Sequence, residues 1–333
     1  MDQKRIIDEF KELVSIEVHS RDERAIADVL KEKLTALGLT VTEDKAGEVL
    51  GGNTGNLYAQ LPGSTGGEPV LFSAHMDRVG NHGHIVPLVK EEEGKIVSDG
   101  TSILAGDDIG GVAAILAMLR EVKEKQIPHG PIEVAFSVCE ETGVEGSRQY
   151  DFSKFRSKSA FVYDASGKAG TIVLAAPSKG RVTIHVHGVT AHAGNEPEKG
   201  LNALKVAADL IMQLPDGRLS PVSTANFSII EAGSATNVVC DLVTITGEQR
   251  SRDAKEYQQI SADIQAAADK ISEKYHTKIE VELHTLYHAF KLEETSRPCV
   301  LAKEAAEAVG AAPFFKEGGG GMDANHFNEH GIA

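Results

Sequence analysis

Three apolar runs, each followed at once by polar residues, constrain the fold of this chain more than any other feature. The runs are PVLFSA at 69–74, IEVAFSVC at 132–139 and AFVY at 160–163, and a helical pattern at 106–124 separates the first two. Uninterrupted apolar runs of this length are typical of strands buried on both faces of a sheet. Strands that alternate with helices predict an α/β fold with a mostly parallel central sheet covered by helices.

A different pattern occupies residues 179–291. Here the predicted order of elements is β-α-β-β-α-β, a recognised compact α+β unit. The first pattern resumes at 292 with a helix, followed by the loop KEGGGGMDANHF. We therefore predict one domain formed by 1–178 and 292–333, and an inserted domain formed by 179–291.

Composition narrows the classes of function. The formal net charge is −15 over 333 residues, so a nucleic acid is not expected as a partner. No apolar run reaches the ~20 residues of a membrane-spanning helix, and the first residues lack an apolar signal core, so no membrane association is expected. The three cysteines lie far apart in the sequence, which favours a reducing, cytoplasmic location.

The polar residues of interest all stand at predicted strand ends or in a turn before a helix. They are His75 and Asp77 after the first run, Asp107 and Asp108 before the helix, Glu140 and Glu141 after the second run, and Asp164 after the third. Because ligands of open α/β sheets bind beyond the carboxyl ends of the strands, these side chains are expected to meet at one edge.

Six carboxylates do not gather as bare anions, because repulsion and desolvation raise their pKa values or push them apart. Divalent cations resolve the conflict. An oxygen-rich set with an imidazole suits zinc, cobalt or manganese, and two such ions ~3.5–4 Å apart can share a carboxylate. Each motif alone has an ordinary explanation, such as an N-cap for GDDIGG. The joint occurrence of the motifs predicts a metal-dependent hydrolase. His82 and His84, in the loop after the first strand, are not expected to be ligands.

Seven segments, in this order, resemble the metallopeptidase family of peptidase T, carboxypeptidase G and acetylornithine deacetylase. They are SAHMDRV, GDDIGG, CEETGVEGS, VYDAS, GVTAHAGNEPEKGLNAL, SATNVVCD and GEQRSRD. The resemblance covers nearly the whole chain and is closest to peptidase T-like tripeptide aminopeptidases. It implies hydrolysis of amide bonds in small peptides, two divalent metal ions, and an inserted lid domain through which the chain forms a homodimer.

The resemblance also implies a role for each matching residue. The implied metal ligands are His75, Asp107 as the bridging carboxylate, Glu141 and Asp164. Asp77 is implied to orient His75, and Glu140 to act as the general base. In the family the peptide bond between the residues matching Asp107 and Asp108 is cis. In the lid, His192 is implied to stabilise the oxyanion, and Asn237 and Arg250 to contact substrate carbonyl and carboxylate groups.

The sequence departs from the family pattern at its end. The family's last metal ligand is a histidine beyond the GGMDANHFNEHGI segment, and the sequence stops at Ala333. The expectation is a truncated catalytic domain whose second metal site lacks an imidazole, with His326 and His330 in other roles. Two alternatives stay open: a deacylase of N-acyl amino acids that uses the same metals, and a homologue that binds without catalysis.

Overall fold

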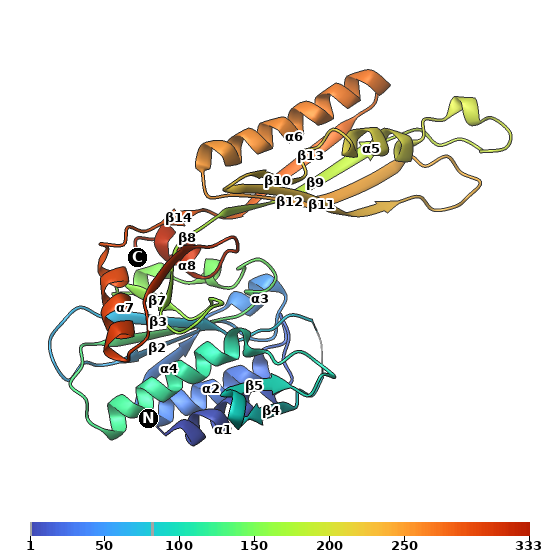
Figure 1. Cartoon of the computed structure of the whole chain (residues 1–333). Coiled ribbons are helices and arrows are strands. Elements are labelled where there is room, and N and C mark those ends of the chain that lie inside the picture. Colours follow the sequence, from blue (N-terminus) through green and yellow to red (C-terminus); the bar gives the residue numbers. More distant parts are fainter. Residues whose placement is uncertain (1, 81–82) are drawn as a thin grey trace. The chain divides into compact units, whose positions relative to one another are not determined.

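The computed structural model describes residues 2–80 and 83–333, so His82 lies outside the described residues. The chain divides into two compact units (Figure 1). Unit 1 comprises Met1–Leu174, Leu292–Glu317 and Gly321–Ala333, and unit 2 comprises Ala175–Lys291 and Gly318–Gly320.

Unit 1 is built on a five-stranded sheet of order β1-β2-β6-β3-β7. The strands are β1 (Thr40–Glu43), β2 (Leu57–Leu61), β3 (Val70–His75), β6 (Ile132–Ser137) and β7 (Ala160–Val162). The strand β3 runs parallel to β6 and β7, whereas β1 and β2 run antiparallel to their neighbours. The predicted α/β class is confirmed, and the sheet is mixed, with its parallel half formed by the three predicted strands.

Both faces of this sheet are buried. On one face, β2, β3 and β6 pack against three helices: α1 (Gln3–Val14), α2 (Arg24–Ala36) and α4 (Gly106–Glu124) (Figure 1). On the other face, Leu71 and Ala135 pack with Phe327 of α8 (Ala324–Glu329). Alternate residues of β6 supply the two faces, and this explains why the strand reads as an unbroken apolar run.

The other α-helices and strands of unit 1 lie outside the central sheet. They are α3 (Ala46–Leu50), the hairpin of β4 (Pro87–Lys90) and β5 (Lys95–Ser98), the strand β8 (Thr171–Ala176), which runs into unit 2, α7 (Arg297–Ala308) and β15 (Phe314–Glu317).

Unit 2 is an antiparallel sheet of order β10-β11-β12-β9-β13 with two helices on one face (Figure 1). The elements are β9 (Ser178–His187), α5 (Ala203–Ile211), β10 (Gly217–Ser220), β11 (Ser223–Ala232), β12 (Leu242–Ser251), α6 (Ala254–Tyr275) and β13 (Ile279–Tyr287), followed by the two-residue β14 (Phe290–Lys291). The order of helices and longer strands is the predicted one, and β10 is an addition that sequence reasoning missed.

The helices of unit 2 begin and pack for identifiable reasons. Asp253 caps α6 by accepting the backbone N–H groups of Lys255 and Glu256. Apolar residues of α5 and α6 then bury against alternate residues of β9 and β12 in one core. Among the described helices of the chain, none combines the length and the apolar character that crossing a bilayer requires.

Candidate metal centre

The predicted site residues of unit 1 come together at the carboxyl edge of the parallel strands. His75 is the last residue of β3 and lies opposite Ser137, the last residue of β6. Asp107 stands at the start of α4, where the Asp107–Asp108 peptide bond is cis, as the family resemblance implies. Parallel strands end at the same edge of a sheet, and this is why residues from four separate segments meet there.

His75 is almost fully buried, and both nitrogens of its ring have partners. Its Nδ1 lies 3.0 Å from the backbone carbonyl oxygen of Asp77, and its Nε2 lies 3.0 Å from Oδ1 of Asp107. A carbonyl oxygen can only accept, so Nδ1 carries a hydrogen and donates it. The contact therefore leaves Nε2 as the ring atom that can bind a metal ion.

Asp77 is fully buried and connects three segments of the chain. Its Oδ1 accepts the backbone N–H of Glu140 at 3.0 Å, and its Oδ2 accepts the N–H of Glu141 at 3.2 Å. The hydroxyl of Ser20 donates to the same Oδ2 at 2.6 Å, and Oδ1 lies 3.4 Å from Nδ1 of His75. One carboxylate thus contacts the imidazole of His75 and fixes the backbone of both glutamates.

Two groups of potential ligand atoms occur among the described residues, and both include His75. The first is His75, Asp107 and Glu141, and the second is His75, Glu140 and Asp164. Within each group the ligand atoms lie within 4.8 Å of one another. The groups contain every predicted ligand together with the predicted base.

The carboxyl groups of the centre have strongly shifted acidities. Burial, followed by the negative charges of neighbouring carboxylates, raises the pKa of Glu140 to about 10 and that of Asp164 to about 8. Burial also raises the pKa of Glu141 and, more strongly, of Asp108. Glu140 and Asp164 therefore hold protons at neutral pH unless another positive charge stands beside them.

The groups closest to the imidazole shift the other way. The hydrogen bond to His75 lowers the pKa of Asp107. Burial is the largest influence on Asp77 and opposes its ionisation, but the contact with His75 and the hydrogen bonds from Ser20 and the N–H of Glu140 together outweigh burial and lower the pKa. Burial alone would lower the pKa of His75, yet its bonds to Asp107 and Asp77 raise that pKa well above the ordinary value. The centre therefore favours positive charge.

The donor set fits divalent metal ions of the zinc type. It offers one imidazole nitrogen in the correct tautomer and several carboxylate oxygens within coordination range of one another. Buried carboxylates with raised pKa values are stabilised as anions when a cation replaces the protons that they otherwise take up. An oxygen-rich set with one imidazole matches the ligand preference of zinc, cobalt and manganese.

Sequence reasoning missed two polar groups that support this centre. Ser20 holds Asp77, and Asp323 is buried below the strand ends, where Ser137 Oγ donates to it at 2.5 Å. The charge of Asp323 contributes to the raised pKa values of Glu140 and Asp164. A lone acidic residue in the apolar context of GGMDANHF was the available signal for Asp323.

In unit 2 the loops that carry His192 and Asn237 lie side by side. Val238 forms a β-bridge with His192, and the N–H of Ala193 donates to the carbonyl oxygen of Asn237 at 3.0 Å. Nδ1 of His192 accepts the N–H groups of Gly194 and Asn195. The neutral ring therefore carries its hydrogen on Nε2, which can donate to a substrate oxygen.

Arg250, the other predicted substrate contact, stands on β12 in an ion pair. Its Nε donates to Oε1 of Glu248 at 2.7 Å, and one terminal nitrogen reaches the carbonyl oxygen of Gly319 at 3.4 Å. A carboxylate is thus already bound to the guanidinium, the group that would recognise a substrate carboxylate.

The last two histidines of the chain have structural partners. His326 is buried, and its Nε2 lies 3.2 Å from the carbonyl oxygen of Val144. His330 stacks on Phe152, with ring centroids 3.7 Å apart. Neither belongs to the two ligand groups around His75.

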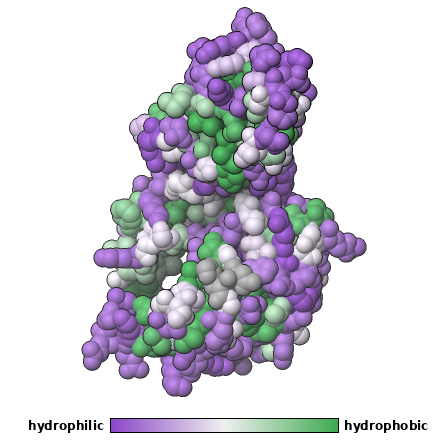
Figure 2. Space-filling model, turned by 90° about the vertical axis from the view of Figure 1, so that its right-hand side faces the viewer, coloured by the Kyte–Doolittle hydropathy of each residue, from purple (hydrophilic) through white to green (hydrophobic). Residues whose placement is uncertain are grey.

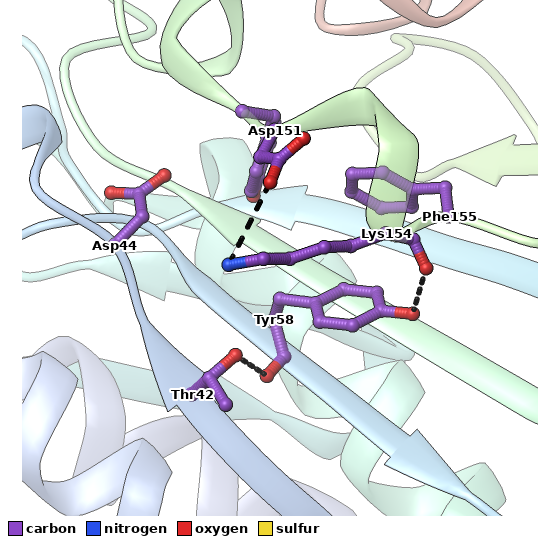
Figure 3. Close-up of a pocket in the computed structure, with 7 residues that line it drawn as sticks. Thr42, Asp44, Tyr58, Asp151, Lys154 and Phe155 are labelled. Atoms are coloured by element: carbon purple, nitrogen blue, oxygen red, sulfur yellow. Dashed lines mark hydrogen bonds and ion pairs between the residues drawn. The ribbon is translucent and has the colours of Figure 1, made fainter.

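A small cavity of about 20 Å³ lies elsewhere in unit 1 (Figure 3). It lies between β1, β2 and the segment 150–155, and Lys154 extends across it toward Asp151, at 4.0 Å. Its lining residues are Thr42, Asp44, Tyr58, Tyr150, Asp151, Lys154 and Phe155. The space suffices for about one water molecule and includes no residue of the metal centre.

Comparisons with known proteins agree with the geometry. Residues 177–276 match the family model described as a peptidase dimerisation domain, and residues 56–196 match peptidase family M28. YqjE of Bacillus subtilis, an uncharacterised protein, is 36% identical over 332 residues, which cover 100% of this chain and 89% of YqjE.

Two solved structures are similar along the whole chain. Aminopeptidase PepT from Bacillus cereus has 39% sequence identity and a TM-score of 0.88, with 100% of this chain and 89% of PepT covered. A tripeptidase from Staphylococcus aureus has 33% identity and a TM-score of 0.92, with 100% and 88% covered. This chain is therefore a metallopeptidase of the peptidase T-like branch of the peptidase T, carboxypeptidase G and acetylornithine deacetylase family.

Proposed function

We propose that this metallopeptidase is a dinuclear zinc aminopeptidase that removes the N-terminal residue from tripeptides. The observation that carries the proposal is the pair of ligand groups centred on His75, which together contain Asp107, Glu140, Glu141 and Asp164. The names of the similar PepT and tripeptidase structures support the choice of substrate.

In this proposal His75, Asp107 and Asp164 hold one ion, and Asp107 and Glu141 hold the other. When bound there, zinc would supply Lewis-acid polarisation of the scissile carbonyl and would lower the pKa of a water. His75 presents Nε2 because the Asp77 carbonyl fixes the hydrogen on Nδ1. Asp77 is the positioning residue of the centre, since its carboxylate holds the backbone of both glutamates.

Glu140 is the proposed general base. Its side chain is buried at the centre, and its pKa of about 10 shows how strongly this position favours a proton. A cation beside Glu140 lowers that pKa toward the working range of a base. The carboxylate then takes the proton of the attacking water and returns it to the leaving amine.

We propose His192, Asn237 and Arg250 as substrate contacts. The Nε2–H of His192 donates to the oxygen of the scissile carbonyl, and its tautomer supports this role. Asn237 contacts a substrate carbonyl. Arg250 binds the C-terminal carboxylate in exchange for part of its pairing with Glu248.

The substitution Glu140→Gln tests this chemistry. It removes the base while keeping the size of the side chain, so zinc content per chain should stay at the parent value. Turnover of a leucyl tripeptide should fall by about 10²–10⁴-fold. Turnover of the variant near the parent level with any peptide would show that Glu140 is not the base.

A substrate panel tests the specificity. Zinc-loaded protein should hydrolyse tripeptides such as triglycine faster than dipeptides, and should leave N-acyl amino acids intact. Faster release of acyl groups would establish the deacylase alternative. Saturating zinc without hydrolysis of either class would establish a binding homologue. Parallel loading with cobalt and manganese identifies the preferred ion.

We further propose that the chain forms a homodimer through unit 2 and works in the cytoplasm. The match to a dimerisation domain and the exposed apolar side chains of unit 2, which include Ile229 and Ile230, support the first proposal. Apolar residues, green in Figure 2, interrupt the hydrophilic surface of this unit in the upper part of the view. Three buried free cysteines support a reducing compartment.

A further inference from the structure

The backbone that leads to Glu140 is held by side chains of other segments. Beyond the end of β6, four successive N–H groups, those of residues 138–141, donate to side-chain oxygens. Val138 donates to Oδ1 of Asn56, Cys139 to Oε1 of Glu23, and Glu140 and Glu141 to the two oxygens of Asp77. Asn56, Glu23 and Asp77 are all fully buried. The segment therefore has no freedom to shift unless a buried hydrogen bond is broken.

Glu23 holds Cys139, the residue directly before the proposed base Glu140. It stands directly before α2, and its Oε1 accepts the backbone N–H groups of Arg21 and Cys139, each at 3.0 Å. The thiol of Cys139 contacts the same oxygen at 3.5 Å. Among the described residues, none bonds Oε2 of Glu23. In the described structure, this buried carboxyl group therefore acts by holding the backbone of Arg21 and Cys139.

The conformation of Cys139 explains why this link matters for the next residue. Cys139 has φ of 50°, in the left-handed region that residues other than glycine rarely adopt. Such a backbone persists only where its surroundings hold it. Loss of the acceptor would let Cys139 relax toward an ordinary conformation, and the side chain of Glu140, the next residue, would then enter the site in a different direction.

We propose that Glu23 is a positioning residue for Glu140, an inference that rests on the proposed role of Glu140 as the base. Glu23 does not reach the metal centre. Its carboxyl group fixes Cys139, and Cys139 fixes the direction in which the side chain of Glu140 enters the site. The proposed ligands His75, Asp107 and Asp164 lie outside the segment 138–141, and Asp77 also holds the N–H of Glu141, so metal binding should depend less on Glu23 than proton transfer does.

Two substitutions at Glu23 separate these functions. Glu23→Ala removes the acceptor and should lower kcat by about 10–100-fold, the loss expected for an outer-shell partner. KM and the zinc content per chain should stay close to the parent values. Glu23→Gln keeps an acceptor oxygen at the same reach and should restore most of kcat. Burial raises the pKa of Glu23, and the amide removes the charge without removing the acceptor.

Glu133→Ala is the matched structural control. Glu133 is also a buried carboxyl group that accepts two backbone N–H groups, those of Arg156 and Ser157, but none of these belongs to the segment 138–141. Both alanine variants should therefore lose thermal stability, and only Glu23→Ala should lose kcat. Equal kcat values for the two alanine variants would overturn the inference.

Two further measurements keep the inference testable. If Glu23→Ala fails to fold, Glu23→Asp withdraws the acceptor by one methylene, and its kcat should fall well below that of Glu23→Gln. Equal kcat values for the Asp and Gln variants would overturn the inference. Glu140→Gln assayed in parallel separates the causes: if it loses turnover while Glu23→Ala does not, only the positioning role fails. If Glu140→Gln keeps turnover, the proposed base and the positioning role fail together.

Discussion

At the scale of single residues, the centre depends on a carboxylate that is not among the proposed metal ligands. Asp77 bonds Ser20, Glu140 and Glu141 at the same time and lies beside Nδ1 of His75. A buried carboxylate that serves four partners cannot be replaced by a group with fewer acceptor sites without leaving a donor unpaired. The precision of the site is therefore a property of these supporting bonds as much as of the ligands.

Asp77→Asn tests this dependence. The amide offers one acceptor oxygen instead of two, so either the Glu140 or the Glu141 N–H faces an NH₂ group. Zinc affinity should fall about 10–100-fold, as measured by competition with a chromophoric chelator. Ser20→Ala, which removes only the hydroxyl bond to Asp77, should have a smaller effect. An Asp77→Asn variant that binds zinc as tightly as the parent would contradict this assignment.

At the scale of elements, the fixed loop after β6 depends on close packing as well as on hydrogen bonds. Gly146 lies against the carbonyl of Val138, and a Cβ added at Gly146 would stand 1.7 Å from that oxygen. The carbonyl belongs to the backbone and cannot turn aside without moving the segment that leads to Glu140. Only glycine fits at this approach.

Gly146→Ala should therefore destabilise the protein by about 1–3 kcal/mol, the usual result of forcing extra volume into a packed site. Urea unfolding with zinc present measures this loss, and turnover should fall with it because residues 138–141 are displaced. Gly66→Ala is the matched control, since a Cβ there meets nothing within 4 Å. Equal unfolding midpoints for the two variants would contradict the packing argument.

A group of hydrogen bonds and ion pairs at Glu43 joins α2 to β1. Glu43, at the end of β1, accepts hydrogen bonds from Arg24 and Lys31 of α2, from the hydroxyl of Thr54 and from the N–H of Gly55. The bond to Arg24 is the main reason why the pKa of Glu43 is far below its ordinary value of 4.5. Folding thus favours the ionised form.

This shift makes the contribution of Glu43 depend on pH. A carboxyl whose pKa is lower in the folded state stabilises fully above its unfolded pKa and loses that stabilisation as pH falls toward the folded pKa. The stability difference between the parent and Glu43→Gln should be largest at pH 7 and should shrink below about pH 4.5. Urea unfolding of both proteins from pH 7 to pH 3.5 measures it. A difference that stays constant over this range would show that ionisation of Glu43 is not the cause.

The same elements show how much of the fold can be predicted from the sequence. The strands β3 and β6 are predictable because burial on both faces leaves long apolar runs, and the strand-end rule then locates His75 and Glu140. The strand β10 escapes prediction because its four residues are mostly exposed and leave no hydrophobic pattern. Nothing in the local sequence sets the antiparallel direction of β2.

The supporting groups of the site escape prediction for a different reason. The bond from Ser20 to Asp77 spans 57 positions, that from Cys139 to Glu23 spans 116, and that from Ser137 to Asp323 spans 186. Only the folded chain brings these partners together. Sequence therefore identifies residues that share a strand-end position, and structure identifies those that hold them.

At the scale of the whole molecule, the strand order of unit 2 bears on how the proposed homodimer would form. The sheet of unit 2 ends at β10 on one side and at β13 on the other, and β11 lies beside β10. The edge of β13 carries the charged residues Glu280, Glu282 and Lys278 at or beside it, and charge at an edge discourages pairing with another chain. The strand β10 covers β11 only as far as Ala225. Beyond it, β11 exposes Ile229 and Ile230, so β11 is the favoured edge.

Ile229→Lys and Ile230→Lys test this edge. Both side chains are about half exposed, at 55% and 50%, so lysine should change the stability of the folded chain little. A charge on an edge strand opposes pairing with a second copy. The parent should scatter light as twice 35.5 kDa and the double variant as 35.5 kDa, with unchanged melting temperature.

Leu283→Lys, on β13 and 42% exposed, is the control and should remain dimeric. A parent that is monomeric at assay concentration would refute the dimer. A double variant that stays dimeric would move the contact away from β11.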